Sequence, residues 1–584
     1  MSYFLPEDDP VLASCRGLAR MHPSAIRLSE RPLYLTAADP HPARRVGLVS
    51  GGGSGHEPLH AGLLGRGGLD AVCPGQIFAS PHNGQIVAAS HDVAGPSGVL
   101  HIVKNFTGDV LNFSIAAERL RAEGVTVAEV RVGEDVASTG TGAGRRGTAA
   151  TVAVERILGA AADRGDGLEA LTDLGRRVVE RSRSLAVAAR AHTSPDTLRP
   201  AFTLPADHID YGVGIHGERG ARTLPRPPVE ALVRRMLDDL LSEGANPTAD
   251  PTADPTAARN GLLLVVNGLG STTRLELQAI AAIAGDQLAA RGEKVAAVLA
   301  GTYITALDTA GFSLTLTALE PGWLELWHGT EDREGAHADA GTSVRKPPQA
   351  PVATPRPEPS TDRPRGSRAA LDRYAEITRQ VHDALGRLDQ AAGDGDFGAN
   401  LRGGLRLAVE RVDRTGEDGL GAAAAVFLDQ VGDSAGPLLG ILFDRLAAVT
   451  GAHPGGERPA IPALADASTR ALDAIRRAGG ATTGDRTLID ALAPAARALT
   501  DAPRDADDAI TTAALAAITG ARATAAMLGG RGRASYVGER ALGTPDPGAI
   551  AIALLYCALA DVYEPQHATR LPAPGYVVQP SPRA

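Results

Sequence analysis

Short apolar runs alternate with helical patterns through the first half of the chain. The segment Phe113–Glu123 has the apolar spacing of a helix and lies between runs that are typical of buried strands. Strands that alternate with helices predict an α/β fold with a substantially parallel sheet, in which ligands bind beyond the carboxyl ends of the strands. The predicted strands are Val46–Val49, Val99–Val103, Val125–Val132 and Leu262–Val266.

The second half of the chain has almost no strand pattern. From Leu371 onward, apolar residues recur at helical spacing as far as Leu388, and Gly393 is expected to end this helix. A second helix is predicted through Leu401 and Val412. The remainder is rich in Ala and Leu, with Gly, Pro and Asp between the helical segments. We therefore expect an all-α bundle or barrel.

A proline-rich segment separates the two halves. Residues 331–367 contain few large apolar side chains, so they cannot build a core and are predicted to form a linker. A repeated Pro-Thr-Ala-Asp at 247–254 is predicted to be a surface loop. The predicted division is a first domain at 1–330, the linker at 331–367, a helical domain at 368–566 and a proline-rich tail at 567–584.

Composition narrows the class of protein. A chain of 584 residues is too long for one core, and its formal net charge of −10 argues against a nucleic-acid partner. The three cysteines, Cys15, Cys73 and Cys557, are far apart and form neither a disulfide framework nor a zinc pattern. The N-terminus lacks the basic start of a signal peptide, and the longest apolar stretch, Ala549–Ala560, is too short to span a bilayer. We expect a cytoplasmic protein without a membrane partner.

Three carboxylates lie close together in the second half. Asp389 is predicted in the last turn of a helix, and Asp394 and Asp396 flank a glycine in the loop that follows. Glycine allows tight backbone curvature, so the three acids can converge on one point, where they repel one another unless a cation neutralises them. Hard divalent ions, above all Mg²⁺, suit such a site and bridge to substrate phosphates.

No P-loop motif is present, so other loops must hold any phosphate. Three loops offer backbone N–H groups near a predicted helix N-terminus, which favours an anion. Arg533, in the last of these loops, could add a charge-assisted contact. The loops are Gly432–Gly436, Gly484–Thr487 and Gly532–Ser535.

Polar residues in the first half follow predicted strands. The glycine loop at 51–55 leads into His56, and Asp109 lies after the strand that ends near Lys104. His216 lies between glycines and is therefore expected to be exposed, where a neutral imidazole can act as a nucleophile or base. Three such segments in one domain predict a pocket for a small polar ligand.

These motifs resemble those of a known family. Ser50–Pro58, Gly75–Pro81, Lys104–Asp109 and Gly214–Glu218 resemble the substrate domain of dihydroxyacetone kinases. Leu388–Gly398, Gly484–Thr487, Gly532–Glu539 and Asp546–Gly548 resemble the helical nucleotide domain of the same family, in the order of its single-chain ATP-dependent branch. The resemblance implies an α/β substrate domain of two α/β subdomains, joined to an all-α helical barrel that binds ATP and Mg²⁺. It also implies a homodimer and a small ketose substrate.

The resemblance further implies roles for single residues. His216 would hold the ketone as a covalent hemiaminal, while His56 and Asp109 would handle the proton of the attacking hydroxyl. The implied substrate-binding residues are Gly53, Ser54, Gly55, His56, Lys104 and Asp109. The implied metal ligands are Asp389, Asp394 and Asp396. The implied nucleotide-binding residues are Asn400, Ser434, Thr487, Arg533, Asp546, Pro547 and Gly548.

The chain departs from the family pattern at two places, and alternatives stay open. The nucleotide loop of the family usually reads Gly-Gly-Thr/Ala-Ser-Gly, whereas Gly432–Gly436 has an acid in place of the second glycine and its serine one position earlier. Position 397, often small or polar in the family, is Phe. The leading expectation is phosphorylation of dihydroxyacetone at a terminal hydroxyl. Erythrulose kinase activity is the alternative, and FAD-AMP lyase activity or a non-catalytic sugar sensor are further possibilities. The intact acid trio argues against the sensor, because a sensor needs no metal site.

Overall fold

The structure is a computed structural model. The chain forms two compact units, Met1–Thr342 and Ser343–Ala584. It describes the chain except residues 1–2, 7, 142–143, 196–197, 221, 243–259, 330–364, 393–396, 451–457, 532–534, 536–537 and 580–584. The Pro-Thr-Ala-Asp repeat and most of the predicted linker lie outside the described residues.

The described residues of the first unit form two six-stranded sheets, and the first of them is largely parallel. Its order is β1-β2-β4-β3-β5-β6, in which β3 pairs in parallel with β4 and β5, and β5 with β6. Only the β1–β2 hairpin and the β2–β4 pair are antiparallel. The strands are β1 (Ile26–Glu30), β2 (Leu33–Ala37), β3 (Gly47–Ser54), β4 (Ala71–Ile77), β5 (Val99–Lys104) and β6 (Val127–Val132).

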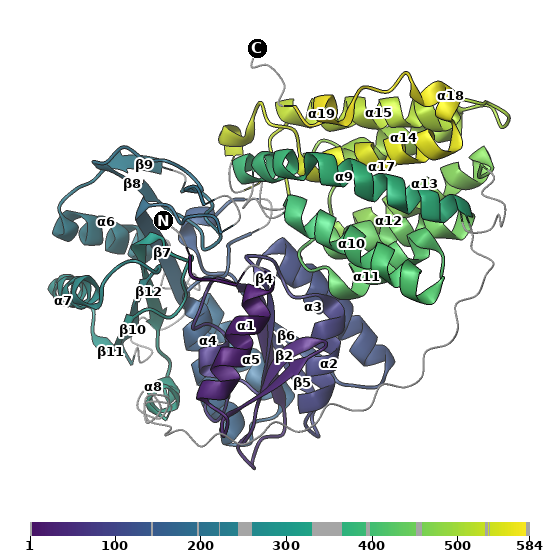
Figure 1. The fold of residues 1–584 in the computed structure, drawn as a ribbon. Coiled ribbons are helices and arrows are strands. Elements are labelled where there is room, and N and C mark those ends of the chain that lie inside the picture. Colours follow the sequence, from purple (N-terminus) through teal and green to yellow (C-terminus); the bar gives the residue numbers. More distant parts are fainter. Residues whose placement is uncertain are drawn as a thin grey trace, which may run out of the picture. The chain divides into compact units, whose positions relative to one another are not determined.

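Helices cover both faces of this sheet (Figure 1). Val49, Val99 and Val103 pack against α2 and α3, whereas Leu100 and Ile102 face the core that α1, α4 and α5 complete. Successive strand residues point to opposite faces, so a strand buried on both sides reads as a continuous apolar run. The helices are α1 (Pro10–Met21), α2 (Asn83–Val93), α3 (Thr107–Ala122), α4 (Ala150–Asp163) and α5 (Leu168–Glu180).

The second sheet corrects the expectation of a substantially parallel arrangement. Its order is β11-β10-β12-β7-β8-β9, and only β10 and β11 pair in parallel. Its strands are β7 (Ser182–Arg190), β8 (His208–Tyr211), β9 (Arg222–Pro225), β10 (Leu262–Gly268), β11 (Val295–Gly301) and β12 (Ala310–Ala318). The helices α6 (Val229–Ser242) and α7 (Arg274–Ala290) pack on one face, and the short α8 (Trp323–His328) follows β12. Both sheets with their helices form the two predicted α/β subdomains.

The described part of the second unit is helical, as predicted. Its helices pack in chain order, each against the next, and α17 closes the ring against α9 (Figure 1). The predicted helical barrel is thus confirmed. The helices of the ring are α9 (Arg365–Ala392), α10 (Phe397–Thr415), α11 (Gly419–Gln430), α12 (Ala435–Thr450), α13 (Ile461–Gly479), α14 (Ile489–Asp501), α15 (Ala509–Ala523) and α17 (Pro547–Tyr563).

The C-terminal segment that was predicted to be a tail contributes to the helical core. Two short helices, α18 (Pro565–Ala568) and α19 (Pro574–Val577), follow the ring. Val577 and Val578 are buried in the same apolar cluster as α17. Proline begins both helices at a position where its missing N–H costs nothing, so proline content alone was a poor guide here.

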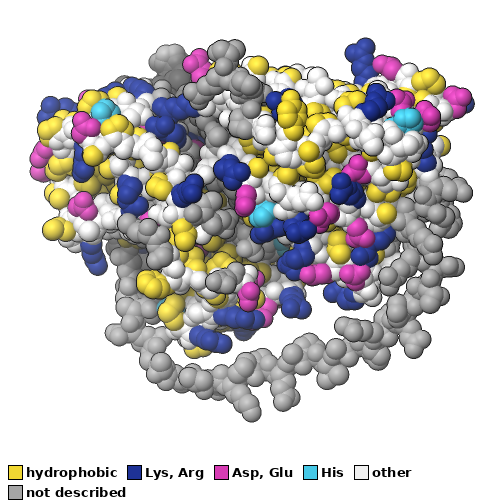
Figure 2. Space-filling model, turned by 45° about the horizontal axis from the view of Figure 1, so that its top comes forward, with side chains coloured by type: hydrophobic (Ala, Val, Ile, Leu, Met, Phe, Trp, Pro, Cys, Tyr) yellow, Lys and Arg dark blue, Asp and Glu magenta, His cyan; other side chains and the backbone are white. Residues whose placement is uncertain are grey.

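The described helices include none that is long and apolar enough to cross a membrane. On the face drawn in Figure 2, Lys and Arg side chains are interspersed with Asp and Glu. The absence of a nucleic-acid partner stays a prediction from charge.

Candidate functional site

Lys104 and Asp109 lie at the carboxyl end of the first sheet. Lys104 ends β5 and is fully buried, and its Nζ is 3.1 Å from the carbonyl oxygen of Gly51 on β3. Asp109 lies in the first turn of α3, two residues after that helix begins, rather than in a loop. The distance from Lys104 Nζ to Asp109 Oδ2 is 3.7 Å, and Asp109 Oδ1 is buried without a hydrogen-bond partner among the described residues. A buried, unpaired acceptor is costly and suits a ligand donor.

Most of the predicted glycine loop is the end of strand β3, because Gly51, Gly52 and Ser54 are paired with β4. A Cβ at Gly52 would lie 2.1 Å from Lys104 Nζ, and one at Gly53 would lie 2.6 Å from the backbone of Phe78. Only glycine allows these close approaches. Ser54 donates its hydroxyl to the carbonyl oxygen of Gly75 (2.8 Å), and the Gly55 amide donates to Glu57 Oε2 (2.9 Å).

His56 is fully buried with one ring nitrogen fixed. Its Nδ1 donates to the carbonyl oxygen of Thr305 (2.8 Å), and its Nε2 is buried with no hydrogen-bond partner within the described residues. Burial, with His216 and Lys104 adding to it, holds the pKa of His56 well below its ordinary value. The ring is therefore neutral near pH 7, and its Nε2 carries a lone pair that can accept a proton.

His216 is buried, with only 3% of its surface exposed, so the expectation of an exposed histidine was wrong. Its ring centroid is 4.4 Å from that of Phe106 and 4.8 Å from that of His56. Its backbone N donates to Glu218 Oε2 (2.8 Å), and its Nδ1 lies 3.3 Å from Glu218 Oε1. A carboxylate beside Nδ1 favours the tautomer protonated there, which leaves the lone pair on Nε2.

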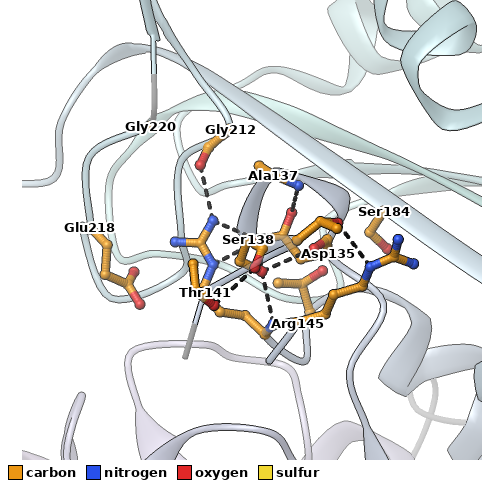
Figure 3. Close-up of polar contacts among 12 residues, drawn as sticks. Asp135, Ala137, Ser138, Thr141, Arg145, Ser184, Gly212, Glu218 and Gly220 are labelled. Carbon is orange, nitrogen blue, oxygen red and sulfur yellow. Dashed lines mark hydrogen bonds and ion pairs between the residues drawn. The ribbon is translucent and has the colours of Figure 1, made fainter. Parts of the chain in front are cut away.

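A buried ion network lies behind Glu218 (Figure 3). Burial would raise the pKa of Glu218, but the contact with His216 and the charge of Arg146 outweigh it and hold that pKa well below its ordinary value. Arg146 in turn donates to Asp135 Oδ2 (2.7 Å) and to the carbonyl oxygen of Gly212 (3.0 Å). A Cβ at Gly214 would lie 2.0 Å from Glu218 Oε2, so glycine is needed there. The network keeps Glu218 ionised beside the imidazole.

In the helical unit, the structure describes one of the three predicted metal ligands. Asp389 lies in the last turn of α9 and is 9% exposed, and its Oδ2 accepts a hydrogen bond from the Phe397 amide (3.1 Å). Asp394 and Asp396 lie outside the described residues, as does Arg533. Within the described ranges, no three His, Cys, Asp or Glu side chains are grouped as a metal site. The three-carboxylate site therefore stays a prediction.

Arg486 lies close to Asp389 and Asp546, although the three residues are far apart in the sequence. Arg486 is fully buried, and its Nη2 donates to the carbonyl oxygen of Thr544 (2.8 Å). Its Nε and Nη1 are buried without hydrogen-bond partners in the described part of the chain. Burial, with Asp389 and Asp490 adding and Arg486 opposing, raises the pKa of Asp546 to about 6. Unpaired guanidinium donors beside carboxylates suit a phosphate together with a cation, so this region fits a metal–nucleotide group.

The remaining predicted nucleotide-binding residues lie at helix ends. Asp490 accepts hydrogen bonds from the amides of Gly484 (2.6 Å) and Thr487 (2.9 Å), which shapes the loop before α14. Asp546 caps α17 by accepting from the Ala549 amide (2.7 Å), so Pro547 and Gly548 begin that helix. Asn400 lies in the first turn of α10, and Ser434 directly precedes α12.

The two departures from the family pattern have structural explanations. Asp433 has a φ of 58°, a conformation in which glycine is favoured and in which Asp is among the better tolerated residues. Phe397 is 8% exposed and packs in the helical core, so its ring is not a surface feature. Neither residue removes a side chain that the resemblance assigns to the nucleotide.

Several buried polar residues near these sites were not predicted. Glu155 contacts His60, which in turn contacts Lys104. Arg146 lies near Glu218, and Arg486 lies near Asp389 and Asp546. One signal was available: Glu155 is an acid in the middle of the apolar helix α4, where a charged side chain is costly unless it is paired. The others gave no pattern, because their partners come from distant segments.

The family follows from comparison with known proteins. Residues 16–335 match the Dak1 domain, and residues 391–561 match the DAK2 domain. The chain belongs to the dihydroxyacetone kinase family. Within this family, the human triokinase/FMN cyclase is 35% identical over 538 residues, covering 89% of this chain and 92% of that protein.

Two further members of the family cover nearly the whole chain. The L-erythrulose 1-kinase of Mycolicibacterium smegmatis is 33% identical over 96% of this chain and 99% of its own. The crystal structure of the dihydroxyacetone kinase from C. freundii in complex with AMP-PNP and Mg²⁺ is 28% identical, covers 96% of this chain and 100% of its own, and has a TM-score of 0.50. Both domains of the family are therefore present here in one chain.

Proposed function

We propose that this chain is an ATP-dependent kinase that phosphorylates a terminal hydroxyl of a short ketose, with dihydroxyacetone as the first candidate substrate. One observation carries the proposal. His216 lies against His56 in a buried cluster in which His56 Nε2 and Asp109 Oδ1 have no hydrogen-bond partner among the described residues. A small polar molecule with a carbonyl and hydroxyl groups would supply what these atoms lack.

His216 is the nucleophile in this proposal. Its Nε2 lone pair adds to the ketone carbon, so that a C–N bond forms, the π bond of the carbonyl breaks, and the oxygen takes up a proton from solvent to become a hydroxyl. The positive charge that develops on the ring is stabilised by Glu218, whose carboxylate lies beside Nδ1. A molecule without a carbonyl, such as glycerol, cannot be held in this way, which gives the site its selectivity.

Asp109 and His56 take the proton from the terminal hydroxyl as it attacks the γ-phosphate. Asp109 Oδ1 and His56 Nε2 are both acceptors without partners, so either can receive it. Lys104 lies 3.7 Å from Asp109 and provides positive charge beside the reacting oxygen. Phosphoryl transfer depends on such positioning and charge neutralisation more than on covalent chemistry at phosphorus.

The helical unit holds the nucleotide. Asp389, Asp394 and Asp396 would hold Mg²⁺, which neutralises charge on the ATP phosphates when it is bound. Arg486, with two buried donors unpaired, and the loops at Thr487 and Ser434 would orient the phosphates. Asn400, Arg533 and the start of α17 at Asp546–Gly548 complete the proposed nucleotide contacts.

The test is an assay of ADP release by the full chain with Mg²⁺ and ATP. The substrates are dihydroxyacetone, glyceraldehyde, both enantiomers of erythrulose, and glycerol. We expect turnover with at least one ketose and none above background with glycerol. Equal rates with glycerol and the ketoses would contradict the carbonyl-dependent mechanism.

The names of two relatives support alternatives that the same protein sample can test. Since one relative is an L-erythrulose 1-kinase, a higher kcat/KM for L-erythrulose than for dihydroxyacetone would reassign the substrate. Since another is a triokinase/FMN cyclase, incubation with FAD and analysis for a cyclic flavin product tests a second candidate function. The predicted homodimer and the cytoplasmic location remain part of the proposal.

A further inference from the structure

A continuous chain of buried hydrogen bonds leads from α4 to Lys104. Glu155 Oε1 lies 2.6 Å from His60 Nδ1, and His60 Nε2 lies 2.6 Å from Lys104 Nζ. All three side chains are at most 5% exposed. Of the proposed site residues, Asp109 meets this chain through its ion pair with Lys104 (3.7 Å), whereas His56 Nδ1 donates elsewhere, to the Thr305 carbonyl oxygen.

The neighbours of His60 fix its tautomer. The Ser50 hydroxyl donates to the carbonyl oxygen of Ile102 (2.8 Å), so its oxygen can only accept from His60 Nδ1, 3.1 Å away. Glu155 is a carboxylate and also only accepts. His60 Nδ1 therefore carries the proton, and Nε2 presents its lone pair to Lys104.

Two of the three N–H groups of the Lys104 ammonium have partners in these contacts. One N–H is directed to the Gly51 carbonyl oxygen (3.1 Å) and one to His60 Nε2 (2.6 Å). An ammonium has three donors, and the third remains for the side on which Asp109 lies, 3.7 Å away. That distance is longer than a hydrogen bond, so Lys104 is held back from Asp109.

We propose that His60 and Glu155 are positioning residues that hold the Lys104 ammonium away from Asp109 and aim its third N–H at the substrate. The proposal rests on the proposed function, since it assigns a role within that reaction. Without the His60 acceptor, the Lys104–Asp109 ion pair, now 3.7 Å long, would shorten to a direct hydrogen bond. Asp109 would then be a weaker base, and the lysine donor would no longer face the substrate oxygen.

The charge of Glu155 has a separate effect from its hydrogen bond. Burial lowers the pKa of Lys104, whereas Asp109 and Glu155 raise it. His60 from the loop after β3 and His56 also face this ammonium. Removing the charge of Glu155 removes one of the two groups that keep Lys104 protonated. As the pH rises, the variant should therefore lose activity at a lower pH than the wild type does.

The experiment compares three variants of the full chain with the wild type. His60→Leu removes the acceptor, His60→Gln restores one through its amide oxygen, and Glu155→Gln removes only the charge. His91→Gln is the matched control, because His91 and Glu123 form a similar pair that is exposed. Ketose kinetics as a function of pH, ketose binding without ATP by calorimetry, and ¹⁵N spectra of the histidine rings are measured.

The expected pattern separates positioning from simple packing. His60→Leu should lower kcat by about 100-fold while the ketose Kd changes less than about 5-fold, because a misdirected group costs rate more than binding. His60→Gln should recover at least about 10-fold of that loss. Glu155→Gln should move the alkaline limb of the kcat profile about 1 unit to lower pH.

Two results would overturn the proposal. His60→Leu as active as His60→Gln would mean that the side chain only fills space, and an unmoved alkaline limb in Glu155→Gln would remove the role of its charge. The ring spectra need no turnover: Nδ1 protonation of His60 supports the arrangement and Nε2 protonation contradicts it. An inactive wild type with the expected ring spectrum would therefore count against the proposed function and not against this inference.

Discussion

The two units of this chain prepare their sites by opposite electrostatic means. In the α/β unit, burial keeps the His56 imidazole neutral, and the charged side chains of Lys104 and Glu218 each contact a buried histidine. In the helical unit, carboxylates lie near one another, and the pKa of Asp546 is raised to about 6. The guanidinium of Arg486 has two buried donors without partners among the described residues.

This difference corresponds to what each unit is proposed to bind. A neutral ketose is recognised by a nucleophile and by hydrogen bonds, so the α/β unit presents the neutral His56 ring and leaves single acceptors, such as Asp109 Oδ1, for the ligand. A metal–nucleotide complex brings charges of both signs, so the helical unit leaves some of its own uncompensated. Experiments that change one unit at a time can therefore break or sharpen the comparison.

The largest expected effect comes from His216→Ala. Loss of the nucleophile removes the covalent hold on the ketone, so kcat/KM for the ketose should fall by about 1,000-fold or more. The KM for ATP should stay within about 3-fold, because the nucleotide is proposed to bind in the other unit. His208→Ala is the control, since His208 pairs with exposed Asp207. A ketose kcat/KM within 10-fold of wild type would remove His216 from the mechanism.

Asp389→Asn should have the next largest effect. The change keeps the acceptor for the Phe397 amide and removes one charge from the proposed metal site, so kcat should fall by about 100-fold and higher Mg²⁺ should be needed. Asp466→Asn, in an exposed pair with Arg470, is the control. Titration of activity with Mg²⁺ checks the prediction, and an unchanged Mg²⁺ requirement would contradict the role of Asp389.

In the α/β unit, His101→Gln should reduce the loss of stability in acid. Burial lowers the pKa of His101 from 6.5 to about 3, so the folded unit resists protonation that the unfolded chain accepts. This contribution is fully present above pH 6.5 and is lost as the pH falls toward 3. Between pH 7 and 5.5 the wild type should lose about 1 kcal/mol more than the variant. Trp323 and Trp327 are the only tryptophans, and both lie in this unit, so fluorescence reports its unfolding.

In the helical unit, Asp546→Asn should change stability in the opposite direction. The raised pKa of Asp546 means that its contribution is present below about pH 3.8 and is lost as the pH rises through about 6. Asn still caps α17, so the variant should be more stable than wild type at pH 7.5, by less than about 1 kcal/mol because Asn loses the attraction of the carboxylate to Arg486 and to the helix N-terminus. Helical circular dichroism at pH 5 and 7.5 measures this. A variant less stable than wild type at pH 7.5 would show that the charge is compensated.

Local patterns were sufficient for much of the fold. The apolar runs at Val99–Val103 and Leu262–Val266 are strands β5 and β10, and the spacing from Leu371 to Leu388 lies in α9. Strand direction in the second sheet was not predictable, because it depends on which distant strands pair. There, β12 lies between β10 and β7 and is antiparallel to both.

The candidate site also has features that the sequence predicts and features that it does not. Glycine-rich motifs marked His56 and His216 because their spacing is local. The burial of His216 was not predictable, since it depends on Phe106 and on the contacts of Glu218 with a distant arginine. The link from Glu155 through His60 to Lys104 joins three segments that are far apart in the chain, so no sequence motif indicates it.

The division of labour between the units is tested most directly by calorimetric binding to the full chain. Dihydroxyacetone and, separately, AMP-PNP with Mg²⁺ are titrated into the wild type, His216→Ala and Asp389→Asn. The account predicts that His216→Ala loses ketose binding and keeps nucleotide binding, and that Asp389→Asn does the reverse. Loss of both ligands in either correctly folded variant, or unchanged ketose binding in His216→Ala, would contradict it.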